Sequence, residues 1–150
     1  MKNTMKFGQG RLANAAAVMA VAAVLFPASA WSADMVIRIR NVAQDSGQIR
    51  IAVFEGEGFL RKPVRTESVR ASGGMIDVRI KDMPAGTYAV SAFQDTDGNQ
   101  RLTTNSMGIP EEPYGMSREA KGRYGPPTFD DAKFVLGSED LVVEVKLARP

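Results

Sequence analysis

Hydrophobic residues recur at every second position through much of this chain, and this spacing limits what it can fold into. Ile37 and Ile39 alternate with arginines, and Ile49, Ile51 and Val53 continue the same pattern. Successive side chains of a β-strand point to opposite faces, whereas a helix repeats its apolar positions every three to four residues. The alternation, with two shorter candidates, predicts seven strands at about 37–39, 49–53, 64–69, 76–80, 88–93, 133–136 and 141–147.

Turn-forming residues separate these strands. Asp45-Ser46-Gly47 lies between the first two, Gly73-Gly74 precedes the fourth, and residues 83–86 lie between the fourth and fifth. Seven short strands without a stretch of helical period predict an all-β fold, a single antiparallel β-sandwich of immunoglobulin-like or transthyretin-like type. A small β-barrel would produce the same local pattern, and strand order cannot be read from it.

The segment 95–131 lacks this alternation and is far longer than an ordinary connection. It contains aromatic residues and four prolines, and disordered linkers are poor in aromatics. We therefore expect one long ordered loop that packs over one end or face of the sandwich.

The first thirty residues have the pattern of a secretory signal peptide. Lys2, Lys6 and Arg11 precede a mostly Ala/Val/Leu run at 12–26, and an A-x-A site ends at Ala30. The run is shorter than the roughly 20 residues that span a bilayer. We expect cleavage of residues 1–30, a β-sandwich domain at 31–150 with no membrane anchor after cleavage, and a periplasmic or secreted location.

The basic charge of the chain belongs to this leader. The chain has 19 Lys and Arg against 17 Asp and Glu, and the leader contains three of the basic residues and none of the acidic ones. The remaining 16 cations against 17 anions give a net charge of −1, and those cations are scattered. This distribution argues against a nucleic-acid partner.

The chain contains neither cysteine nor histidine, and this excludes several kinds of chemistry. Thiolate nucleophiles, disulfides, a Ser-His triad and metal sites built on Cys or His are all impossible. Catalytic residues are not predicted, and no motif requires a cofactor. Any chemistry must therefore come from carboxylates, hydroxyls, amides, Lys, Arg or Tyr.

Asp95, Asp97 and Asn99 form the sharpest local motif. Oxygen-bearing side chains at every second position can converge on Ca²⁺, which takes six to eight oxygens. An EF-hand is rejected, because Gln100 stands where the loop needs glycine and position twelve is not glutamate. The alternative is an Asx turn that needs no metal. Further ligands could come from Asn105, Glu111 or Glu112 if the loop folds back.

Other residues of the long loop suggest a recognition surface. Glu112, Tyr114 and Tyr124 are candidates to contact a ligand, although burial of the two tyrosines beneath the loop is an equal alternative. A carboxylate-based hydrolase would instead use two of the acidic side chains Glu111, Glu112, Asp130 and Asp131. Because neighbouring residues of an extended chain point to opposite sides, the Glu111–Glu112 pair is poorly placed for that role.

Three motifs stand in a defined order along the chain: Asp95-x-Asp97-Gly98-Asn99-x-x-Leu102, Gly108-Ile109-Pro110-x-Glu112-x-Tyr114-Gly115-x-Ser117 and Gly125-Pro126-Pro127-x-Phe129-x-x-Ala132-x-Phe134. Together they resemble the bacterial domain-of-unknown-function family 2141, over about residues 36–147. The resemblance implies an exported β-sandwich without an assigned activity. Gln100 and Thr103 depart from the usual loop of that family, and Thr103 replaces one candidate ligand.

A more distant resemblance is to the carboxypeptidase regulatory-like, transthyretin-like and collagen-adhesin B-type domains, some relatives of which carry calcium at comparable loops. The leading hypothesis is an exported, non-enzymatic binding or structural domain whose long loop recognises an envelope protein or saccharide, with Ca²⁺ as a possible organiser. The alternatives are a hydrolase of cell-envelope sugar or peptide and an accessory subunit of an envelope complex.

Overall fold

Eight strands and one short helix make up the part of the chain that the computed structural model describes, residues 32–44 and 46–149. In chain order they are β1 Ser32–Val42, β2 Gln48–Phe54, β3 Arg65–Arg70, β4 Gly74–Pro84, β5 Gly86–Asp95, β6 Tyr114–Met116, α1 Phe129–Ala132, β7 Phe134–Leu136 and β8 Leu141–Lys146. The all-β prediction is confirmed, and each of the seven predicted strands is present. The predicted signal peptide, residues 1–30, lies outside the described residues.

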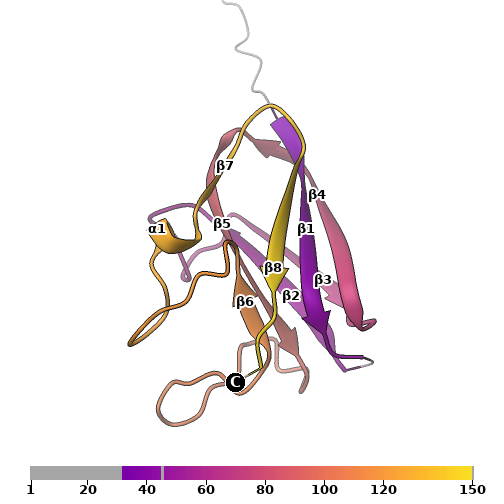
Figure 1. The fold of residues 1–150 in the computed structure, drawn as a ribbon, viewed down its shortest axis with the longest axis vertical. Helices are drawn as coiled ribbons and strands as arrows, with labels where there is room; N and C mark the ends of the chain where they lie inside the picture. Colours follow the sequence, from indigo (N-terminus) through magenta and orange to yellow (C-terminus); the bar gives the residue numbers. More distant parts are fainter. Residues whose placement is uncertain (1–31, 45, 150) are drawn as a thin grey trace, which may run out of the picture.

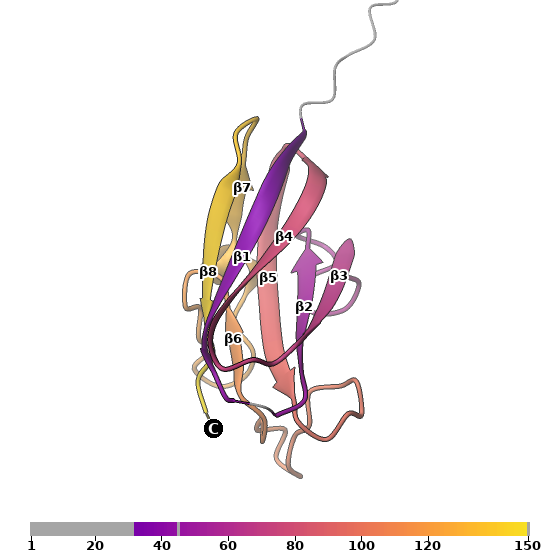
Figure 2. The same cartoon turned by 90° about the vertical axis from the view of Figure 1, so that its right-hand side faces the viewer.

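The strands form two facing sheets (Figures 1 and 2). One has the order β4-β1-β8 and the other β3-β2-β5-β6, while β7 pairs with the first part of β5. The pairs are antiparallel except β1 with β8, which run parallel. The antiparallel prediction misses this pair because β8, the last strand, returns to β1 after the chain has built the other sheet.

The two sheets are joined along the side where β6 meets β8. Tyr114 and Ala148 exchange two backbone hydrogen bonds of 3.1 and 2.8 Å, and Ser117 forms a bridge with Val145. Gly115 lies between these contacts, and a Cβ there would be 2.3 Å from the carbonyl oxygen of Lys146. The close approach of β6 to β8 therefore requires glycine at this position.

The core lies between the sheets and is built from the alternating positions. Met35, Ile37 and Ile39 of β1 are fully buried, as are Ile49 of β2 and Val145 of β8. Burying such a side chain contributes about 1.5–3 kcal/mol, so the inward faces of these strands supply much of the stability.

Strand β5 is buried on both faces, as expected of a central strand. Tyr88, Val90 and Ala92 face the core, while Ala89 is covered on the opposite side. The Ser117 hydroxyl anchors this covering, because it donates to the carbonyl of Ala132 at 2.7 Å and accepts from the Val90 N–H at 3.0 Å. The rigid β5 thus carries the chain to Asp95, where the candidate site begins.

The segment 95–131 contains regular structure of its own. Besides β6 and the start of α1, it holds a small hairpin in which Thr104 bridges Pro110. The Asn105 side chain closes the hairpin by accepting from the backbone N–H groups of Met107 and Ile109. Among the described residues, no helix has the length and apolar character needed to cross a membrane.

Candidate functional site

The site begins where β5 ends, at Asp95. This residue pairs with Gln48 across β2, and its side chain is only 1% exposed. Its Oδ2 atom accepts from Arg50 Nε at 2.9 Å and from the Gln100 N–H at 3.0 Å. The chain curls tightly enough for the second bond because Gly98 and Gln100 both have positive φ, 74° and 67°. Residues 96–100 therefore wrap around the Asp95 carboxylate.

Glu112 returns to the same place from the far end of the hairpin. Its side chain is buried, Oε1 accepts from the Thr96 N–H at 2.8 Å and from Thr96 Oγ1 at 3.1 Å, and Oε2 accepts from the Thr103 N–H at 3.0 Å. These bonds join residues 96–103 to the strand that follows. Glu112, predicted as a residue of the loop surface, is placed at the base of the loop.

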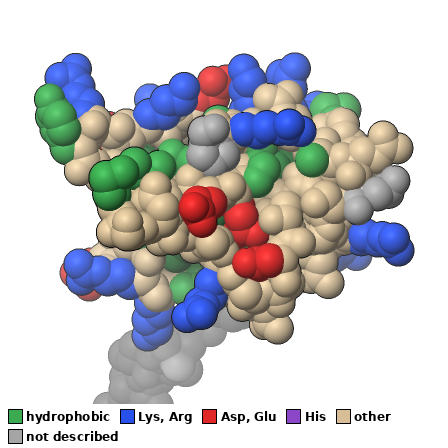
Figure 3. All heavy atoms as spheres, turned by 90° about the horizontal axis from the view of Figure 1, so that it is seen from below, with side chains coloured by type: hydrophobic (Ala, Val, Ile, Leu, Met, Phe, Trp, Pro, Cys, Tyr) green, Lys and Arg blue, Asp and Glu red, His purple; other side chains and the backbone are tan. Residues whose placement is uncertain are grey.

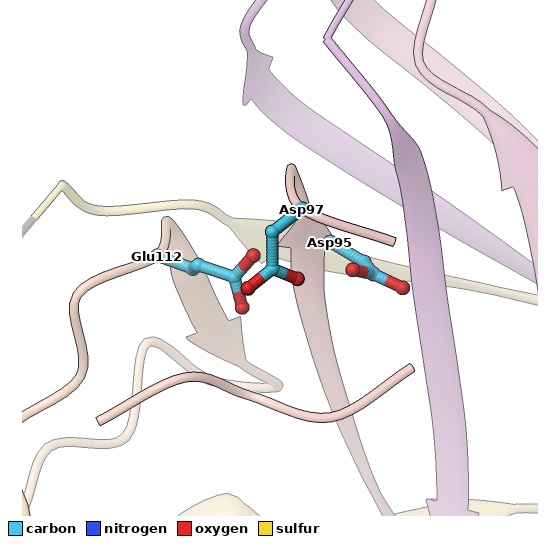
Figure 4. A group of neighbouring side chains, drawn as sticks. All are labelled: Asp95, Asp97 and Glu112. Carbon is cyan, nitrogen blue, oxygen red and sulfur yellow. The ribbon is translucent and has the colours of Figure 1, made fainter. Parts of the chain in front are cut away.

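Asp95, Asp97 and Glu112 together form a group that we call the carboxylate cluster. Each contributes one oxygen, and these oxygens lie within 4.8 Å of one another. Figure 4 shows Asp97 between the other two and one oxygen of Asp95 turned toward it. Oδ2 of Asp95 is held by Arg50 on β2. The other oxygen, Oδ1, is buried and has no hydrogen-bond partner among the described residues.

The pKa of Asp95 lies below its ordinary value of 3.8. Burial opposes this by disfavouring the charged form, but the hydrogen bond from Arg50, the backbone N–H groups of Gln100 and Gly98 and the charge of Arg50 outweigh it. The N–H of Gly98 contributes to the lowered pKa of Asp95, but it is not placed to form a hydrogen bond with the carboxylate. Asp95 is therefore an anion at neutral pH, held by one cation.

This lowered pKa predicts acid sensitivity. Because the folded pKa is below the unfolded one, Asp95 contributes stability that is complete above the unfolded value, near pH 4, and is lost as the pH falls through the folded value. Denaturation of protein from which Ca²⁺ has been removed beforehand, measured between pH 5 and about pH 2, should show this loss. Asp95→Asn should flatten the slope, and the remaining slope comes from Asp34, Asp77 and Asp131, whose pKa values are also lowered. An unchanged slope in this variant would contradict the assignment.

Asn99 lies beside the cluster and forms an Asx turn with Asp97. The Asn99 N–H donates to Asp97 Oδ1 at 3.0 Å, and Asn99 Nδ2 donates to Asp97 Oδ2 at 2.8 Å. Its own Oδ1 accepts from the Arg101 N–H at 2.7 Å. Asn99 thus orients Asp97, while Glu112 brings the third carboxylate to the cluster.

A hollow of about 620 Å³ opens beside the cluster. Its charged lining residues are Arg50, Arg70, Asp95 and Asp97, and we call it the arginine hollow. Seen from the loop end of the molecule, acidic side chains gather near the middle of the face, with Lys and Arg side chains around them (Figure 3). Cationic and anionic groups therefore meet at this end.

The other candidate residues predicted from the sequence do not belong to the carboxylate cluster. Tyr114 is half-buried in β6, and Tyr124 is fully exposed. Asp131 forms a capping box with Thr128 at the start of α1, and Asp130 pairs with Lys133 at 2.6 Å. With Glu112 held by Thr96 and Thr103, structural contacts therefore occupy three of the four carboxylates that a hydrolase could use.

Sequence reasoning missed Arg50 as a residue of the site. Alternation placed it on the outward face of its strand, but nothing local indicates that this strand lies beside the end of β5. No short sequence motif could have revealed this pairing, because 45 residues separate Arg50 from Asp95.

A match to a protein-family model supports the resemblance that the three ordered motifs indicated. Residues 37–144 match a protein family described as "Uncharacterized protein conserved in bacteria (DUF2141)". No curated protein and no solved structure matches the chain. The matched region runs from β1 to β8 and includes the whole carboxylate cluster. The chain therefore belongs to the DUF2141 family of bacterial proteins.

Proposed function

We propose that this protein is an exported, non-enzymatic binding or structural domain whose loop end is organised by Ca²⁺ bound at Asp95, Asp97 and Glu112. The secretory pattern of residues 1–30 supports the periplasmic or secreted location. An envelope protein or saccharide is the expected partner of the loop end, because long ordered loops on a rigid scaffold commonly carry recognition.

The observation that carries the metal proposal is the unpartnered Oδ1 atom of Asp95. A buried carboxylate oxygen without a hydrogen bond costs free energy, and native structures leave few such atoms unsatisfied. The Asp95 carboxylate lies against two further carboxylates, and the nearby N–H of Gly98 does not form the missing hydrogen bond. A bound cation would satisfy Oδ1.

Charge supports the same conclusion. The cluster brings three carboxylates together, and the one ion pair that its members form within the described residues is Arg50 with Asp95. Like charges this close disfavour the folded loop unless a cation offsets them. A bound divalent cation would offset the excess negative charge of the cluster.

The ligand chemistry selects Ca²⁺. Three carboxylates from a curled loop offer oxygen ligands only, which suits a hard cation, and Ca²⁺ accepts irregular shells of six to eight oxygens. Mg²⁺ demands near-ideal octahedral geometry and gives up its waters reluctantly, so we expect it to bind more weakly.

Calorimetric titration of EDTA-treated protein with CaCl₂, followed by thermal melts, tests the proposal. At a free Ca²⁺ concentration one hundred times Kd, stabilisation should be about 2.7 kcal/mol and Tm should rise by about 10 °C. Asp97 is exposed and near-isosteric with asparagine, so Asp97→Asn should fold normally and lose most of this shift.

Glu111→Gln is the matched control, because Glu111 is the exposed neighbour of Glu112 and lies outside the cluster. It should retain the full calcium shift. Identical melting curves of the wild-type protein in CaCl₂ and EDTA, or an equal shift in Asp97→Asn, would refute the metal site.

A further inference from the structure

The arginine hollow lies on the outer face of the five-stranded sheet, beside the carboxylate cluster. Strand register places Arg70, Gln48 and Asp95 in one row across β3, β2 and β5, and Arg50 follows two residues along β2 on the same face. Residues of the 96–100 curl also line the hollow. Two guanidinium groups therefore line the same space as two of the proposed Ca²⁺ ligands.

Arg50 is held in a defined orientation. Its Nε atom donates to Asp95 Oδ2 at 2.9 Å, and its side chain is 27% exposed. Within the described residues, no hydrogen bond uses its two terminal nitrogens. A guanidinium group fixed through Nε presents these nitrogens as a planar pair of donors, a geometry that matches a carboxylate.

The charge of the hollow depends on the cation. Without Ca²⁺, the two arginines are balanced by Asp95 and Asp97. Bound Ca²⁺ adds two positive charges at the edge of the hollow, and three carboxylate side chains leave part of a six- to eight-oxygen shell to other ligands. The loaded hollow would therefore attract an anion that the unloaded hollow would not.

Resting on the Ca²⁺ site proposed above, we infer that the arginine hollow binds a carboxylate group of a small ligand between Arg50, Arg70 and the bound Ca²⁺. Binding of the two partners is coupled: Ca²⁺ raises the affinity for the carboxylate, and the carboxylate raises the affinity for Ca²⁺ by the same factor. The protein then recognises acidic ligands in a calcium-dependent way.

Calorimetry with two monocarboxylate probes tests the inference. Methyl galacturonoside presents a carboxylate on a sugar and N-acetylglycine presents one on a peptide-like frame, so the tighter of the two identifies the source. In excess CaCl₂ at least one probe should bind about tenfold or more tightly than in EDTA, and it should tighten Ca²⁺ binding equally. Methyl galactoside, which lacks the charge, should not bind.

Arg70→Gln should weaken probe binding by about tenfold without weakening the binding of Ca²⁺ alone. Arg65→Gln, at the exposed opposite end of β3, is the matched control and should bind the probe like the wild-type protein. Calcium binding without probe binding would overturn the carboxylate site and leave the calcium site intact. Equal probe binding in EDTA, or by Arg70→Gln, would also overturn it, whereas absent calcium binding would refute the proposed function itself.

Discussion

Gly47→Ala is expected to destabilise the protein by about 3–5 kcal/mol, because two separate costs meet at this residue. Its φ of +71° disfavours any side chain, and a Cβ there would lie 1.8 Å from the carbonyl oxygen of Asp95 and 3.0 Å from Thr96 Cα. Both contacts are with backbone, which cannot rotate away. To relieve these contacts, the end of β5 must move away from the turn that precedes β2. The displaced residue is Asp95, where the candidate site begins.

Gly98→Ala is the matched control for this prediction. Gly98 has nearly the same φ, +74°, but a Cβ there meets nothing within 4 Å. It should show the conformational cost alone, about 1–2 kcal/mol. Urea denaturation followed by circular dichroism measures both variants in EDTA, so that metal binding does not contribute. If both variants lost the same free energy of unfolding, the clash with Asp95 would cost nothing, and the prediction for Gly47→Ala would be wrong.

Glu112→Ala is expected to cost about 3 kcal/mol in EDTA, because a buried carboxylate that accepts three hydrogen bonds is removed. The N–H groups of Thr96 and Thr103 would lose their partner, and only backbone contacts such as the Glu111 N–H to Thr103 carbonyl bond of 2.9 Å would still hold this segment. The calcium response should disappear as well, since Glu112 is one of three proposed ligands.

Two further variants separate the causes of this loss. Glu111→Ala removes an exposed neighbouring carboxylate and should change stability by less than about 0.5 kcal/mol. Glu112→Gln keeps one acceptor oxygen, so its loss should be smaller than that of alanine. If Glu112→Gln were instead more stable than the wild-type protein in EDTA, repulsion within the cluster would exceed the hydrogen bonding, contrary to our expectation.

Much of the fold could be predicted because its signals are local. The alternation of Ile37 and Ile39, or of Ile49 and Ile51, depends on the two-residue period of a strand, and burial follows from it directly. Strand β6 could not be found this way. Tyr114-Gly115-Met116 is too short to alternate, and it is a strand because β5 lies on one side and the chain after β8 on the other.

The sequence by itself determined seven of the eight strands and the turns between them, and it offered the Asx turn of Asp97 and Asn99 as one of two alternatives, because each depends on residues a few positions apart. Tertiary structure alone decided which charges surround Asp95. Arg50 reaches it through the pairing of β2 with β5, and Glu112 reaches Asp97 through the return of the hairpin. The position of Arg50 depends on the register of β2 with β5, and that of Glu112 depends on the path of the hairpin. Neither produces a periodic pattern in the sequence.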